Sequence, residues 1–124
     1  MATRKGDGII LCIGDDLVNL NLRCSYLQRN GWRVISSGTG YDGVMRFNRE
    51  PVGGVVLDLD DDGSESALIA AELKRLRADV PVIMLISEES RIAPGATAQA
   101  DAVLKKSDEV TGLHAALKKL LGAA

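Results

Sequence analysis

The chain has 124 residues, 46% hydrophobic and 26% charged, which suits one globular domain with its own core and leaves no room for a second. Its formal net charge of -2 provides no basic field for phosphate backbones, which argues against direct nucleic-acid binding. Its apolar runs fall far short of the roughly 18 residues of a membrane span, and no signal-type segment follows the amino terminus. We therefore expect a cytoplasmic, non-membrane protein, with residues 1–8 as a flexible tail and residues 9–121 as the domain.

Two apolar runs in the first half of the chain end in acidic residues. The run at 9–13 is followed by Gly14, Asp15 and Asp16, and the run at 52–57 is followed by Asp58. Short apolar runs bounded by turn residues indicate strands buried on both faces, as in a parallel sheet. Between these two strands the pattern predicts a helix over 17–30, a strand over 32–37, a loop over 38–43 and a short helix over 44–48.

The same alternation continues to the end of the chain. It predicts a helix over 64–78, strands over 82–86 and 102–104, and an amphipathic helix over 110–121, while Pro94 and Gly95 interrupt a short helix within 91–99. Strands that alternate with helices build βαβ units, and these place helices on both faces of a parallel sheet. We therefore predict an α/β fold with a five-stranded doubly wound parallel sheet.

In such a sheet the carboxyl ends of the strands meet at one rim, where ligands bind. This rim would collect Asp15, Asp16, Asp58, Ser87 and Lys105. Converging carboxylates repel one another unless a cation lies between them, and hard oxygen ligands suit Mg²⁺. A lysine adds a point charge for a phosphoryl oxygen. The pattern therefore indicates phosphoryl transfer to or near Asp58.

From about residue 9 to residue 121 the chain resembles the receiver domain of two-component response regulators. The resemblance implies a flavodoxin-like strand order of 2-1-3-4-5, with about five flanking helices. It also implies a signalling module and not an enzyme, beyond Mg²⁺-dependent autophosphorylation and autodephosphorylation of Asp58. The phosphoryl donor would be a sensor histidine kinase or a phosphotransfer protein, and a downstream effector protein is a further partner.

The resemblance also assigns roles to residues of the rim. Asp58 is the phosphoacceptor, and Lys105 is the lysine that neutralises the phosphoryl group. Mg²⁺ would be held by Asp15, Asp16, Asp58 and the backbone carbonyl of Asp60. The family's usual pair of acids falls either on Gly14 and Asp15 or, with a one-residue deletion, on Asp15 and Asp16.

Other rim positions depart from the family pattern. Ile86 stands where the family has threonine or serine, so the next residue, Ser87, either contacts the phosphoryl group or caps the segment 87–90. Ala102 replaces an aromatic residue, and Lys106 replaces a proline that usually follows a cis bond. These departures favour an altered switch. They also keep open an alternative, a receiver-like module that binds proteins without being phosphorylated.

Three further features have simpler interpretations. Residues 38–43 match the G-x-G-x-x-G dinucleotide pattern, but they follow the second strand and open a short helix, so nucleotide binding is the less favoured reading. Cys12 and Cys24 are expected to be small buried side chains. His114, which has no acid or serine partner nearby in sequence, is expected to be structural or exposed.

Overall fold

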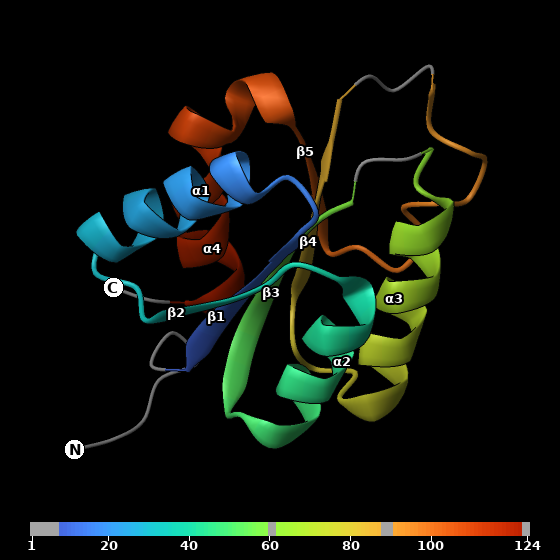
Figure 1. Ribbon diagram of the computed structural model, residues 1–124, viewed down its shortest axis with the longest axis horizontal. Helices are drawn as coiled ribbons and strands as arrows, with labels where there is room; N and C mark the ends of the chain where they lie inside the picture. The colour runs from blue at the N-terminus through green and yellow to red at the C-terminus, as the bar shows by residue number, and fades with distance from the viewer. Residues whose placement is uncertain (1–7, 60–61, 88–90, 123–124) are drawn as a thin grey trace.

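The computed structural model describes residues 8–59, 62–87 and 91–122, so all but Gly8 of the predicted tail lies outside it. Five strands form one parallel sheet in the order β2-β1-β3-β4-β5, which confirms the predicted doubly wound topology (Figure 1). The strands are β1 (Ile9–Gly14), β2 (Val34–Ser37), β3 (Val52–Asp58), β4 (Val82–Ile86) and β5 (Ala102–Lys105). The α-helices in the described residues are α1 (Leu17–Arg29), α2 (Gly40–Arg49), α3 (Ser64–Leu76) and α4 (Glu109–Leu121).

The helices cover the two faces of the sheet in pairs, with α2 and α3 on one face and α1 and α4 on the other (Figure 1). Successive side chains of a strand point to opposite faces, so each central strand supplies two cores. Leu11, Val55 and Leu57 pack with the α2 and α3 side, whereas Cys12 and Val56 pack with the α1 and α4 side. This double coverage explains why β1 and β4 are buried along their whole length.

The connection from β4 to β5 differs from the prediction of a short helix within 91–99. Its described part is a series of turns, in which the backbone N–H groups of Ala96, Ala98 and Ala100 each donate to the carbonyl three residues earlier. Gly95, with a φ of +79°, allows the chain to turn after Pro94. No described helix therefore covers the side of β5 that carries Val103, which is 41% exposed.

The glycine-rich segment forms the start of α2, where Thr39 is the N-cap. A Cβ at Gly40 would lie 2.6 Å from Cδ1 of Ile69, and a Cβ at Gly43 would collide with the side chain of Ile13. These two glycines let α2 approach α3 and β1 closely, which gives the motif a packing role.

The middle of α4 and the loop before β2 are joined by a polar contact. Trp32 Nε1 donates a hydrogen bond of 2.8 Å to Nδ1 of His114, and their rings meet edge to face. This contact gives His114 a structural role. None of the described helices combines the length and apolarity that crossing a bilayer demands.

Candidate functional site

Asp58, the last residue of β3, is a carboxylate buried between two cationic side chains. It is 3% exposed; its Oδ2 accepts a hydrogen bond of 2.8 Å from Nη2 of Arg23. Its Oδ1 lies 2.8 Å from Nζ of Lys106, an ion pair that does not meet hydrogen-bond geometry. A carboxylate buried this deeply needs such partners, because an unpaired buried charge is strongly destabilising.

Arg23 enters the site from α1, where it lies on the buried face with Leu20 and Leu27. It is only 4% exposed. Its guanidinium also donates two hydrogen bonds to Glu109 at the start of α4, from Nε to Oε2 at 2.7 Å and from Nη2 to Oε1 at 3.1 Å. Burial opposes the charged form, but the hydrogen bonds and charge of Glu109 and the charge of Asp58 outweigh it and raise the pKa of Arg23. The guanidinium is therefore a permanent positive charge beside Asp58.

Sequence reasoning missed Arg23 because one arginine in an amphipathic helix is usually solvent-facing. The available signal was its spacing, three residues after Leu20 and four before Leu27, which places it on the buried stripe of α1. Glu109 was missed as well, since an acid in the first turn of a helix needs no other explanation than the helix dipole.

The lysine at Asp58 is Lys106, and the prediction of Lys105 at this contact was wrong by one residue. Lys105 ends β5 opposite Ile86, and its side chain is exposed. Lys106 opens the 3₁₀ turn η3 (Lys106–Asp108), and this change of backbone direction lets its ammonium reach Asp58. Two adjacent lysines look alike in sequence, and only the end of the strand separates them.

This correction moves the neighbouring assignments by one position. Val103 and Ser107, and not Ala102 and Lys106, now stand three residues before and one residue after the contacting lysine. Neither Val103 nor Ser107 matches the aromatic residue or the proline of the family pattern. No cis peptide bond occurs in the stretches of chain that the structure covers.

The predicted metal ligands are distributed differently from the expectation. Gly14 pairs with Asp58 in the β1–β3 register, so a glycine and not an acid lies directly beside Asp58. Asp16 is the N-cap of α1, with Oδ1 accepting from the Asn19 N–H at 3.2 Å and Oδ2 from its side-chain amide at 3.0 Å. Asp15 is exposed, and Asp60 lies outside the described residues.

These side chains do not fit Mg²⁺ in the predicted arrangement. Among the residues with described positions, no three His, Cys, Asp or Glu side chains lie together, although Mg²⁺ needs only one or two protein carboxylates. A Cβ at Gly14 would lie 3.2 Å from the Asp58 carbonyl oxygen and 3.6 Å from Nη1 of Arg23, so the guanidinium borders the space into which a side chain at 14 would point. The described cations on the Asp58 carboxylate are therefore those of Arg23 and Lys106.

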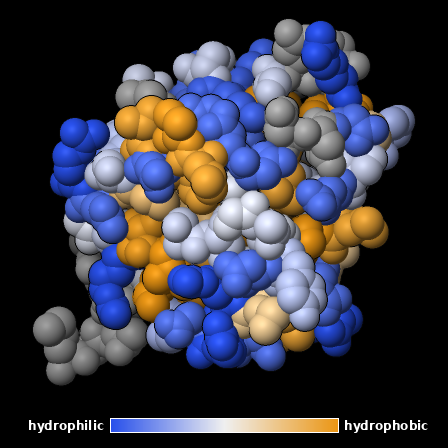
Figure 2. Space-filling view, in the orientation of Figure 1, coloured by the Kyte–Doolittle hydropathy of each residue, from blue (hydrophilic) through white to orange (hydrophobic). Residues whose placement is uncertain are grey.

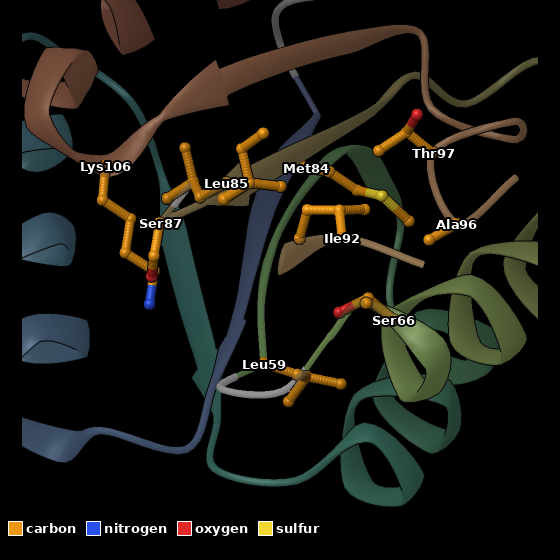
Figure 3. Close-up of a pocket in the computed structure, with 11 residues that line it drawn as sticks. Leu59, Ser66, Met84, Leu85, Ser87, Ile92, Ala96, Thr97 and Lys106 are labelled. Carbon is orange, nitrogen blue, oxygen red and sulfur yellow. The ribbon is translucent and has the colours of Figure 1, made fainter. Parts of the chain in front are cut away.

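Ser87 follows β4 and is exposed, while Ile86 before it is buried. Ser87 and Lys106 both line a hollow of about 10 Å³, room for about one water molecule (Figure 3). The other lining residues are mainly apolar and come from α3, β4 and the turns before β5, among them Met84, Ile92 and Ala96. The alternative role of Ser87 as a cap of segment 87–90 involves residues 88–90, which lie outside the described residues.

The two cysteines differ more than expected. Cys12 is buried in β1 and hydrogen-bonds Cys24 on α1. This hydrogen bond is the main cause that lowers the pKa of Cys24 to about 7, against the opposing effect of burial. The charge of Arg23 and a hydrogen bond from Ser36 lower it further. The same hydrogen bond and its own burial raise the pKa of Cys12 well above the usual value. Cys24 is therefore a candidate reactive thiol next to the site.

The fold is the one seen in solved response-regulator receiver domains. Response regulator TrrA of Thermotoga maritima, solved in complex with Mg²⁺ and BeF, has a TM-score of 0.83 and 24% identity over 92% of this chain and 99% of its own. The receiver domain of a sensor histidine kinase from Pseudomonas aeruginosa PAO1, with a magnesium ion in its active-site cleft, has a TM-score of 0.78 and 20% identity over 94% and 98%. These similarities establish the shared fold.

Sequence comparison points in the same direction. The transcriptional regulatory protein GlrR of Escherichia coli (strain K12) is 31% identical over 81 residues, which are 65% of this chain. The transcriptional regulatory protein QseF of Escherichia coli O157:H7 matches to the same extent. The chain spans only 18% of the length of either relative. No family model matches the chain.

Proposed function

We propose that this chain, with residues 9–121 as its functional unit, is a non-enzymatic receiver-type signalling module that acts by binding protein partners while Asp58 remains an internal ion pair. The observation that carries this proposal is the state of Asp58: it is 3% exposed, and each carboxylate oxygen lies 2.8 Å from a cation. A carboxylate that attacks a phosphoryl group needs an accessible oxygen in line with it. Arg23 hydrogen-bonds one oxygen, and the ammonium of Lys106 lies beside the other.

An exposed apolar surface on α1 supports partner binding. Leu17, Val18 and Leu22 are 62%, 69% and 64% exposed, and Figure 2 shows hydrophobic side chains gathered over this helix. Clustered exposed apolar residues on a small domain mark interaction sites. Leu22 also lines an open groove that reaches Arg23, Lys106 and Glu109, so a partner on α1 would adjoin the ion pairs of Asp58. The partner we propose is a sensor histidine kinase or a downstream effector protein.

A second candidate function is phosphoryl acceptance by Asp58 from a sensor histidine kinase or a phosphotransfer protein. It is favoured by the position of Asp58 at the carboxyl end of a central strand with a lysine ammonium beside it. A response regulator from Burkholderia pseudomallei with the same fold, at a TM-score of 0.77 and 23% identity, was solved with a phosphorylated aspartic acid and a calcium ion. In this candidate Mg²⁺ binds Asp15 and the Asp60 carbonyl, and Arg23 must first leave Asp58.

Treatment with acetyl phosphate and Mg²⁺, followed by intact-mass measurement, separates the two candidates. We expect no mass gain for the wild type, and the same result for Asp58→Asn. TrrA treated in the same mixture serves as a positive control for the donor. A gain of one phosphoryl group by the wild type that Asp58→Asn lacks would replace the first candidate by the second.

A further inference from the structure

We infer that Arg23 is a built-in cation that takes the position of a metal ion beside Asp58 and excludes a divalent cation from this rim. The inference rests on the proposed function in one respect, that Asp58 is held in an ion pair. It adds the residue responsible and predicts that removing this residue creates a metal-responsive protein.

The first argument is steric. Arg23 Nη2 lies 2.8 Å from Asp58 Oδ2, and Nη1 lies 3.6 Å from where a Cβ of residue 14 would be. Gly14 is paired with Asp58 across the two central strands. A side chain at position 14 would therefore project toward the guanidinium, and a glycine leaves this space open for it. The absence of a side chain at Gly14 therefore leaves room beside Asp58 for the guanidinium of Arg23.

The second argument concerns charge. The cluster contains the carboxylates of Asp58 and Glu109 and the cations of Arg23 and Lys106, so its four side chains sum to zero. Without Arg23 the same cluster has a net negative charge, and Asp15 lies one residue beyond Gly14 in the chain. A divalent cation is attracted to the second arrangement and repelled by the arginine in the first.

The third argument is the rigidity of Arg23. Its fork spans Asp58 on β3 and Glu109 on α4, while its own backbone belongs to α1. An arginine held by two carboxylates in a buried position keeps its charge and geometry, which a solvated lysine would not do. The guanidinium therefore competes with a metal ion continuously.

The test measures the effect of Mg²⁺ on thermal unfolding, followed by far-UV circular dichroism. We expect the melting temperature of the wild type to be unchanged by Mg²⁺, and that of Arg23→Leu to rise by about 5 °C or more at saturating Mg²⁺. The rise should disappear in the double variant Arg23→Leu/Asp58→Asn. Arg29→Leu, which removes an exposed arginine from the end of the same helix, should behave like the wild type.

If Arg23→Leu does not fold, Arg23→Gln is used in the same experiment, because glutamine keeps a polar group without the charge. Isothermal titration with Mg²⁺ gives a second readout, in which we expect one binding site in the Arg23 variants and none in the wild type. A wild type that responds to Mg²⁺ as strongly as the variants would overturn the inference. So would folded Arg23 variants that show no response.

The outcome is separable from that of the proposed function. Phosphoryl labelling of the wild type refutes the proposed function, whatever the variants do. Mg²⁺ binding is read from unfolding and calorimetry without any phosphoryl donor. A wild type that is neither labelled nor metal-responsive, together with variants that respond to Mg²⁺, is the result that supports both.

Discussion

Two clusters of charged side chains lie at opposite ends of the sheet, and they are satisfied in different ways. At the amino end Lys74 of α3 donates to Asp101 at 2.6 Å and to the carbonyls of Val80 and Ala78 at 3.0 and 3.3 Å. The same oxygen of Asp101 accepts the N–H of Val82 at 2.8 Å. This cluster ties charges to the backbone around the start of β4 and β5.

The cluster at Asp58 is bonded in another manner. Arg23 and Lys106 meet only carboxylates among the contacts that the structure describes. Charges bonded to backbone groups fix a turn, whereas the charges around Asp58 are balanced by one another. The comparison therefore assigns a structural role to the cluster of Lys74 and Asp101 and a functional role to the cluster of Arg23 and Asp58.

The largest effect that this comparison predicts is that of Arg23→Leu. Removing one partner of a buried ion pair leaves Asp58 and Glu109 undercompensated, so we expect a loss of about 3–5 kcal/mol in the free energy of unfolding without Mg²⁺. Urea denaturation measures it. Arg29→Leu should stay within about 0.5 kcal/mol of the wild type, and equal losses in both variants would contradict a special role of Arg23.

Asp101→Ala should have a smaller effect of about 2 kcal/mol in the same assay, because Asp101 is 37% exposed but serves both Lys74 and the Val82 N–H. It should leave the response to Mg²⁺ and to acetyl phosphate as in the wild type. Asp79→Ala, at an exposed acid close in sequence, is the control. A change in the Mg²⁺ response of Asp101→Ala would break the distinction between the two clusters.

The two adjacent lysines provide the next test. Lys106→Met should lower the free energy of unfolding by about 1 kcal/mol, because its ammonium contacts buried Asp58 although its side chain is 27% exposed. Lys105→Met, at an exposed position, should change it by less than about 0.5 kcal/mol. The reverse order of the two losses would restore Lys105 to the site.

The smallest expected effect concerns Cys24. Its pKa of about 7 means that the thiol is mostly protonated below pH 7 and mostly thiolate above it, so the alkylation rate by iodoacetamide should rise with pH with a midpoint near 7. Mass spectrometry of Cys24→Ser identifies the reacting residue, since Cys12 has a raised pKa and is buried. Arg23→Leu should shift the midpoint upward. An ordinary free-thiol midpoint in the wild type would contradict the lowered pKa of Cys24 and the Cys12 hydrogen bond that is its main cause.

The sequence by itself determined the five-stranded sheet and the position of Asp58 at the end of a central strand. Apolar runs of strand length can be buried only between two layers of helices, so the runs before Gly14, Asp58 and Ser87 had one plausible arrangement. The same pattern placed the rim correctly, because parallel strands end together. The periodicity of apolar residues predicts each strand and helix, and each such pattern lies within one short segment of the sequence.

Tertiary structure alone decided which charges meet. Arg23 and Glu109 are 86 residues apart, and Arg23 and Asp58 are 35 apart, so no local pattern connects them. The choice of Lys106 over Lys105 depends on where β5 ends, and the role of Asp16 depends on where α1 begins. These ion pairs join side chains from different elements, so they depend on how the hydrophobic cores place the helices against the sheet.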